Sequence, residues 1–272
     1  MVFKEFKISA TKEFWDHHWS NISIVEALSR VHRQARLFNL MRTYLPKNAR
    51  ILEAGCGNGQ FVFYLRQYGY DVYGIDYAEE TVNKIRSVIP TAPISIGNIL
   101  SLDYSDNSLG GYISLGVIEH FEDGPYRALK EAHRVLKPRG TLFLTVPYIN
   151  FSRLVSIKWR KLIMEGSGFY QYYFDKNEII KVIRSCGFDI IATHPLDSFT
   201  GFRRLIKSYI NINQNRKKFT SKKSENENKN ENKKNNNLMN QLFYQIAARL
   251  FENPIVEKVF GHIILIIGHK AT

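Results

Sequence analysis

The chain has 272 residues, of which 44% are hydrophobic and 23% charged, a composition typical of a folded globular protein with room for one α/β domain and additions. Its two cysteines, Cys56 and Cys186, are too few for a disulfide framework or a cysteine-based metal site. The charged N-terminus lacks the apolar core of a signal peptide, and the apolar run from Ile263 to Ile267 is far shorter than the ~20 residues that cross a bilayer. These features predict a cytoplasmic protein.

The formal net charge of +13 is concentrated in one segment. Between Phe202 and Asn235, eleven Lys or Arg residues face three Glu residues, a net of +8, which leaves +5 for the rest. Residues 202–212 resemble a basic amphipathic helix, and residues 213–237 contain almost no apolar side chain. Such a segment cannot bury enough surface to offset its ordering entropy, so we expect disorder there.

The N-terminal residues 1–47 are predicted to form a helical extension. Residues 14–19, Phe-Trp-Asp-His-His-Trp, are expected to pack against the following domain or to form a lid over the substrate. Asp16, His17 and His18 could also be read as metal ligands, but neighbouring residues rarely converge on one ion without further partners, and no metal site is predicted. Apolar residues at helical spacing from Ile24 to Leu45 predict an amphipathic helix that ends before Pro46.

Residues 51–61 have the pattern of a strand, a tight turn and a helix. An apolar run meets three glycines at alternate positions, Gly55, Gly57 and Gly59, and an apolar pattern at helical spacing then resumes. Glycine tolerates positive φ and lets a ligand approach the backbone closely. A helix that starts near Gly59 would direct its free N–H groups toward that ligand, which indicates a nucleotide-like cofactor.

The spacing separates two cofactor classes. A dinucleotide fingerprint requires Gly or Ala at the sixth position of the motif, which here is Gln60. The observed pattern is instead an acid, Glu53, followed by three glycines at alternate positions, and a carboxylate there suits a ligand that carries an amino group and a sulfonium. With this motif the chain resembles the class I S-adenosylmethionine-dependent methyltransferases of the type 11/12 kind, and the resemblance implies S-adenosylmethionine as the cofactor.

Further strands supply the remaining predicted contacts to the cofactor. Asp76 ends the apolar segment that starts at Val72, close to the ~20-residue spacing at which an acid binds a ribose diol. In the resembled family the residue at Asn98, often Asp, recognises the adenine amino group, and its neighbour Ile99 packs on the ring. The complete predicted set of cofactor-binding residues is Glu53, Gly55, Cys56, Gly57, Gly59, Asp76, Tyr77, Asn98, Ile99 and Leu115.

Glu119 and His120 follow the strand Tyr112–Leu115 and are the predicted catalytic residues. The pair resembles that of ubiquinone-biosynthesis type O-methyltransferases. Imidazole titrates near neutrality, which makes His120 the candidate general base. In the alternative interpretation, Glu119 only caps the following turn and His120 only shapes the pocket.

The alternation of strands and helices predicts the fold class, an α/β doubly wound, Rossmann-like sheet of seven strands with helices on both faces. The last strand, Gly261–Gly268, is expected to run antiparallel between the fifth and sixth strands, as it does in the resembled family. The predicted segments are the extension 1–47, the methyltransferase core 48–197, the insert 198–237, and a C-terminal helix with the last strand at 238–272. Predicted core helices are 60–67, 79–88, 126–136 and 176–185, the last capped by Asp175.

A long connection from Asn150 to Phe174 follows the fifth strand, Thr141–Val146. Its length and aromatic content predict a lid or an acceptor-binding segment, with packing as the alternative role of its tyrosines. Tyr148, Tyr172 and Tyr173 are the predicted acceptor-binding residues.

The predicted function is O-methylation of a small-molecule, lipid or glycan-precursor acceptor. Enzymes that methylate nucleic-acid bases commonly have an acidic or Asn-Pro-Pro-aromatic tetrapeptide where this chain has Leu115–Ile118, so nucleic acid is not the expected partner. Two alternatives stay open: an RNA methyltransferase that uses the basic insert, and a protein that binds S-adenosylmethionine without catalysis. The basic helix and insert could also hold the protein peripherally at an anionic membrane.

Overall fold

The computed structural model describes residues 2–20, 22, 26–27, 34–160, 168–204, 206 and 254–272. The chain divides into two compact units, each described by itself. The first comprises Met1–Tyr148, Glu165–His194 and Ile264–Thr272, and the second comprises Ile149–Met164 and Pro195–Ile263. This division differs from the predicted segments, because the N-terminal residues share a unit with the core. The predicted disorder of 213–237 and the predicted helix after it lie outside the described residues.

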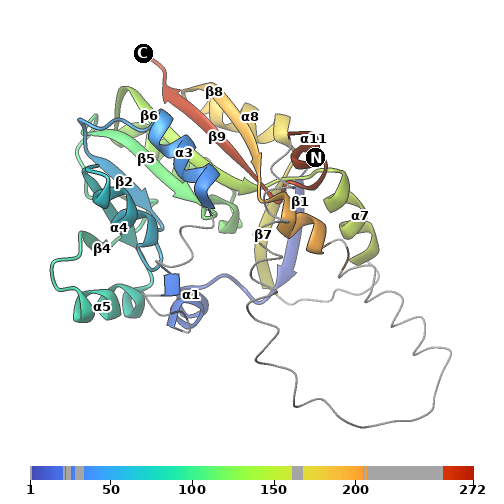
Figure 1. The fold of residues 1–272 in the computed structure, drawn as a ribbon, viewed down its shortest axis with the longest axis horizontal. Helices are drawn as coiled ribbons and strands as arrows, with labels where there is room; N and C mark the ends of the chain where they lie inside the picture. The colour runs from blue at the N-terminus through green and yellow to red at the C-terminus, as the bar shows by residue number, and fades with distance from the viewer. Residues whose placement is uncertain are drawn as a thin grey trace, which may run out of the picture. The chain divides into compact units, whose positions relative to one another are not determined.

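A seven-stranded sheet forms the centre of the first unit, in the order β4-β3-β2-β5-β6-β9-β8 (Figure 1). The strands are β2 (Ile51–Ala54), β3 (Val72–Asp76), β4 (Ile94–Ile96), β5 (Leu109–Leu115), β6 (Leu136–Pro147), β8 (Phe188–Leu196) and β9 (Ile263–Lys270). Parallel pairing joins β2 to β3 and β5, β3 to β4, and β5 to β6. The predicted doubly wound fold is confirmed, and its strand order reverses between β2 and β5, where ligands bind in such sheets.

The last strand also takes its predicted place. β9 lies between β6 and β8, and the His262 N–H donates to the Leu196 carbonyl while the Ala271 N–H donates to the Gly187 carbonyl. The start of β9 therefore meets the end of β8, which makes the pair antiparallel. β6 begins at Leu136, five residues before the predicted start at Thr141.

Helices surround the sheet of the first unit, and α4 and α5 lie beside β3 and β4 (Figure 1). They are α1 (Lys12–Ser20), α3 (Ala35–Tyr44), α4 (Gln60–Gln67), α5 (Glu79–Val88), α6 (Tyr126–Val135) and α8 (Lys176–Ser185). The four predicted core helices are confirmed within one residue at each end. Asp175 caps α8 by accepting hydrogen bonds from the N–H groups of Asn177 and Glu178. Of the helix predicted from Ile24 to Leu45, residues 26–27 are helical and α3 covers Ala35–Tyr44, whereas residues 23–25 and 28–33 are outside the described part.

The prediction of a long loop at 150–174 is wrong. This region contains α7 (Phe151–Arg160) and β7 (Gly168–Phe174), and β7 pairs antiparallel with β1 (Val2–Lys7), a strand placed where only helix was expected. The strand at the N-terminus was missed because its buried side chain is a charged one. Glu5 is 7% exposed and accepts hydrogen bonds from Gln171 and Tyr173.

The second unit contains α7, a helical stretch at residues 198–204, and α11 (Pro254–Phe260). α7 contacts α11, and the ring of Phe202 packs edge-on against Phe260 with centroids 5.5 Å apart. Among the helices in the described part of the chain, none combines the length and apolar character that crossing a bilayer requires.

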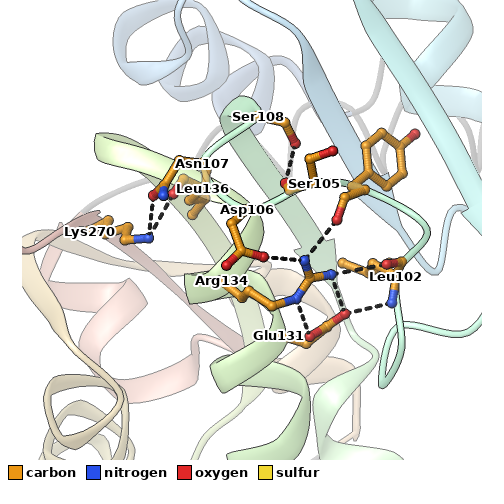
Figure 2. Close-up of polar contacts among 10 residues, drawn as sticks. Leu102, Ser105, Asp106, Asn107, Ser108, Glu131, Arg134, Leu136 and Lys270 are labelled. Atoms are coloured by element: carbon orange, nitrogen blue, oxygen red, sulfur yellow. Dashed lines mark hydrogen bonds and ion pairs between the residues drawn. The ribbon is translucent and has the colours of Figure 1, made fainter.

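Arg134 joins α6 to the loop that leads into β5, as Figure 2 shows. Its guanidinium donates to the carbonyls of Leu102 and Tyr104 at 3.0 and 2.8 Å, and to the carboxylates of Asp106 and Glu131 at 2.6 and 2.8 Å. Glu131 in turn accepts from the Leu102 N–H at 2.6 Å. One side chain thereby satisfies two loop carbonyls that have left regular secondary structure.

We predict that Arg134→Ala lowers the free energy of unfolding by about 1.5–3 kcal/mol, because two loop carbonyls and two carboxylates lose their charged donor. Urea denaturation followed by circular dichroism measures the change. Arg127→Ala on the exposed side of the same helix is the matched control, with an expected change within about 0.5 kcal/mol. Equal effects of both substitutions would contradict the structural role of Arg134.

Candidate functional site

A cavity of about 290 Å³ opens in the first unit, at the carboxyl ends of the parallel strands. It is close to the lower end of the about 300–1,000 Å³ that small-molecule sites span. Its lining residues are Ala10, Thr11, Trp15, Trp19, Gly55, Asp76, Tyr77, Gly97, Asn98, Ile99, Leu100, Leu115, Gly116, Val117, His120 and Phe121. Seven of the predicted site residues are among them: Gly55, Asp76, Tyr77, Asn98, Ile99, Leu115 and His120.

The glycine turn between β2 and α4 needs glycine for both conformation and space. Gly55 and Gly57 have φ of 81° and 51°, values in the left-handed region. A Cβ on Gly55 would lie 2.5 Å from a methyl group of Val117, and one on Gly57 would lie 2.6 Å from the ring of Trp19. The turn is therefore packed between Val117, two residues after the end of β5, and the N-terminal helix.

Asp76, at the end of β3, faces the cavity and fixes the turn at the same time. Its Oδ2 accepts a hydrogen bond of 2.7 Å from the Gly57 N–H, and its Oδ1 accepts one of 2.9 Å from the Ala78 N–H. Burial raises the pKa of Asp76, although these N–H groups stabilise the ionised form. Each carboxylate oxygen keeps a second lone pair that a ligand hydroxyl can use.

Glu53 and Cys56 lie below the turn rather than on the cavity wall. Glu53 is 2% exposed, and its Oε2 has no hydrogen-bond partner among the described atoms. Burial raises the pKa of this carboxyl well above its usual value, and the neighbouring Asp76 raises it further. The Cys56 thiol packs against Gly74, whose added Cβ would lie 2.8 Å from the sulfur. Cys56 is thus a small packing residue under the motif.

Asn98 and Ile99 follow β4 and line the cavity next to Leu100. The Asn98 Oδ1 accepts a hydrogen bond of 2.9 Å from the Leu100 N–H, which closes an Asx turn. The carbonyl that was expected to meet an adenine amino group therefore already has one partner, and its second lone pair is the one left for a ligand.

His120 ends a short 3₁₀ helix, Ile118–His120, directly after β5. Its Nδ1 lies 2.7 Å from the carbonyl oxygen of Tyr170, which can only accept, so Nδ1 carries the proton and Nε2 presents a lone pair. Burial lowers the pKa of His120 below its ordinary value, although the Tyr170 carbonyl and the charge of Glu5 act in the opposite direction. The imidazole is consequently neutral at pH 7 and able to accept a proton.

Aromatic rings of the N-terminal helix and of β7 surround His120. Trp15 and Tyr170 pack edge-on against the imidazole at centroid distances of 4.9 and 5.1 Å. Trp15 and Trp19 belong to the aromatic cluster that the sequence predicted to pack or to cover the substrate, and both line the cavity. They were absent from the predicted site because nothing in their local spacing specifies a ligand.

Contacts with α5 hold the N-terminal helix α1 on the domain, and a contact with Tyr77 holds Ala10 before it. Asp16 accepts from the backbone N–H of Thr81 in the first turn of α5, at 3.2 Å. Lys12 pairs with Glu79 at 2.9 Å, Lys84 donates to the Ser20 carbonyl at 2.9 Å, and Tyr77 donates to the Ala10 carbonyl at 3.3 Å. Asp16 thus acts as a helix cap; within the described ranges, no group of three or more His, Cys, Asp and Glu residues could hold a metal ion.

Other predicted residues lie outside the cavity lining. Glu119 is 2% exposed, and its Oε1 is 4.0 Å from the His120 Nε2, beyond hydrogen-bond distance. Tyr148 is buried in the core, Tyr173 donates to the buried Glu5, and Tyr172 donates to the Glu122 carbonyl at 2.6 Å. Packing and strand pairing thus account for these contacts, the alternative that the sequence had left open for Tyr172 and Tyr173, and their contact with an acceptor stays a prediction.

Comparison with known proteins places this site in a family context. Residues 52–144 match the family model for a methyltransferase domain. The chain is 29% identical over 143 residues to a protein of Mycolicibacterium smegmatis named "Probable S-adenosylmethionine-dependent methyltransferase", and this match covers 53% of each chain. It is 30% identical over 128 residues to the malonyl-[acyl-carrier protein] O-methyltransferase of Pectobacterium atrosepticum, over 47% of this chain and 49% of that one. The matches thus span about half the length of these relatives.

The solved structures agree at the level of the fold. A SAM-dependent methyltransferase of Methanosarcina mazei superposes with a TM-score of 0.53 at 18% identity, over 85% of this chain and 97% of that one. At this identity the likeness concerns the fold alone.

We predict that the neutral His120 imidazole is protonated on Nδ1 and that its pKa is lower than that of a histidine in a short peptide, about 6.5. Nitrogen-15 chemical shifts of the labelled protein, followed from pH 8 downward, report both properties. A neutral ring protonated on Nε2, or a pKa above that of the peptide, would contradict the geometry described above.

Proposed function

Because residues 52–144 match the family model for a methyltransferase domain, we propose that this chain is a class I S-adenosylmethionine-dependent methyltransferase. Its acceptor would be a hydroxyl group of a small molecule, lipid or glycan precursor. The observation that carries the proposal is the placement of Asp76, Asn98 and His120 on one cavity at the carboxyl ends of neighbouring strands. Asp76 would then bind the ribose of the cofactor, Asn98 would bind its adenine, and the neutral His120 would act as a base on the acceptor.

The residues present suit S-adenosylmethionine. Asp76 would hold the ribose hydroxyls, Asn98 and Ile99 would meet the adenine, and Gly55, which lines the cavity, would face the amino-acid part. The buried Oε2 of Glu53, below the glycine turn, has no partner among the described atoms and is an unmet acceptor. When bound, S-adenosylmethionine supplies an electrophilic methyl group on a sulfonium.

In the proposed reaction, His120 Nε2 accepts the proton of the acceptor hydroxyl as that oxygen forms its bond to the methyl carbon. The methyl–sulfur bond breaks and its electron pair stays on sulfur, so the products are the methyl ether, S-adenosylhomocysteine and a protonated His120. The Tyr170 carbonyl holds the imidazole in the required tautomer. Alignment of the reactants contributes about 7–11 kcal/mol in well-oriented systems, and a general base adds about 10²–10⁴-fold.

The lining of the cavity constrains the acceptor. Among its described residues, Asp76 is the one acid and no Lys or Arg is present, whereas Trp15, Trp19 and Phe121 are aromatic. A carboxylate or phosphate at the reacting end of the acceptor would lack a cationic partner there. An uncharged hydroxyl on an apolar or ring-shaped group matches this wall better, which favours an ether as the product.

We predict that the wild-type protein binds S-adenosylmethionine and S-adenosylhomocysteine but not NAD, and that Asp76→Ala weakens the binding at least about tenfold because two charged hydrogen bonds to the ribose are lost. Isothermal titration calorimetry measures the affinities. Asp103→Ala removes an exposed acid and is the matched control. Unchanged affinity in Asp76→Ala would refute the ribose assignment, and an absence of binding to wild type would refute the cofactor.

We predict that His120→Asn lowers the rate of methyl transfer by about 10²–10⁴-fold and leaves the affinity for S-adenosylmethionine unchanged. In wild type, kcat/KM should fall with decreasing pH as His120 becomes protonated, at a pKa below about 6.5. This limb should vanish in the variant. Transfer of a labelled methyl group to the acceptor identified by screening gives the rates, and His269→Asn on β9 is the control. A variant with the wild-type rate and pH profile would remove His120 as the base.

A further inference from the structure

Helix α7 of the second unit is inverted in its described first half, because its polar residues are buried and its apolar residues face outward. Ser152 and Arg153 are 4% and 8% exposed, whereas Phe151 and Leu154 are 68% and 36% exposed. An amphipathic helix of a globular protein normally shows the opposite arrangement. Phe151 is among the most exposed large apolar side chains in the described part of the chain.

Hydrogen bonds fix this orientation. The Arg153 guanidinium donates to the His262 carbonyl at 2.6 Å, and the Arg153 backbone N–H donates to the Asn150 Oδ1 at 2.9 Å. The Ser152 hydroxyl donates to the same Oδ1 at 3.0 Å, and the Asn150 amide donates to the Gly261 carbonyl at 2.5 Å. Rotation of α7 to bury Phe151 would break these bonds and leave a guanidinium without its partners, so the apolar exposure is built into the packing.

The second unit also carries most of the net charge. In its ranges 149–164 and 195–263 the sequence has seventeen Lys or Arg and six Asp or Glu, a net of +11. The first unit has the other twenty-one Lys or Arg and nineteen Asp or Glu, a net of +2. Arg203 and Arg204 are exposed in the described part, next to Ile206, which is 42% exposed. Outward apolar side chains and cations thus occur in the same unit.

We propose that the second unit docks on an anionic lipid bilayer, with Phe151 and Leu154 of α7 inserted at the interface and the net positive charge of the unit attracting the headgroups. Polybasic segments gain affinity from anionic lipid, and inserted aromatic and aliphatic side chains add apolar burial; stable anchoring needs two such signals together. RNA would match the charge but not the outward Phe and Leu. A protein partner would match the apolar pair but has no need of a net charge of +11.

Docking is independent of the proposed methyl transfer. Its consequence does rest on that function: the acceptor would be a lipid, or a molecule carried on one, presented at the membrane surface. The two parts are therefore tested by separate measurements on the same protein.

Flotation of the full chain without S-adenosylmethionine tests the docking, with vesicles of phosphatidylcholine alone and of an equal mixture with phosphatidylglycerol. We expect the protein to float with the anionic vesicles only, and added salt should weaken this flotation. In the double variant Phe151→Ser, Leu154→Ser the fraction of protein that floats should fall by about tenfold or more. Val88→Ser, which replaces an apolar side chain 65% exposed on α5 of the first unit, is the matched control and should float like wild type.

Equal flotation with both vesicle types, no flotation, or full flotation of the double variant would overturn the proposal. Two other results would also overturn it. In the first, wild type does not float but forms an oligomer in sedimentation that the double variant disrupts. In the second, wild type binds RNA and not vesicles. Binding of S-adenosylmethionine, measured by calorimetry, checks that the double variant is folded. If wild type itself did not bind S-adenosylmethionine, the proposed cofactor would be refuted and the flotation result would still stand.

A second variant keeps the test independent of the double substitution. Cys56 and Cys186 are buried, so Phe151→Cys offers an exposed thiol for an environment-sensitive fluorophore. A blue shift of the label on anionic vesicles, absent on neutral ones, is expected. Emission that anionic vesicles leave unchanged would show that this face does not enter the interface and would overturn the docking surface.

Discussion

The carboxylate of Asp76 is the interaction on which the cavity depends. It stands at the end of β3, accepts from the glycine turn after β2 at Gly57, and accepts from Ala78 at the start of α5. Two neighbouring βα connections are thereby held by one side chain, and the positive φ of Gly57 is stabilised by the hydrogen bond its N–H donates. The same carboxylate faces the cavity, so the group that orders the turn is also the group best placed to bind a ligand.

The N-terminal residues, which lie outside the repeating βα units, add further contacts around the cavity. Trp19 lies over Gly57, Trp15 packs against His120, and Asp16 caps α5. β1 contributes indirectly: its Glu5 is held by Gln171 and Tyr173 of β7, and β7 supplies the Tyr170 carbonyl that sets the tautomer of His120. Burial alone would raise the pKa of Glu5, but its hydrogen bonds and Lys7 hold it below the usual value, so its charge persists beside the site.

The parts predictable from sequence were those whose signal is local. The alternation of strands and helices predicted the parallel sheet, and the family resemblance predicted the place of its last strand. The glycine spacing with Asp76 and His120 located the cavity, because parallel strands bring their carboxyl ends to one edge. The missed parts depend on contacts distant in sequence. β1 pairs with β7 more than 160 residues later, and the charged Glu5 at its buried position hides the apolar alternation that would predict a strand. Trp15 and Trp19 became cavity walls through the packing of a helix, which spacing does not encode. The role of Tyr148, Tyr172 and Tyr173 could not be decided from sequence, because aromatic content signals burial as readily as binding.

The separation of charge between the two units suits the chemistry proposed for the first. A sulfonium is a cation, and the cavity presents Asp76 with Glu53 beneath it and no Lys or Arg among its described lining residues. Basic side chains on that wall would repel the cofactor and stabilise the carboxylates in competing ion pairs. With a net of +11 in the second unit and +2 in the first, most of the cations proposed to attract an anionic surface belong to a unit other than the one proposed to bind a cation. At physiological salt, charges more than about 8 Å apart are largely screened, so basic residues outside the cavity lining would have little effect on the proposed cofactor site.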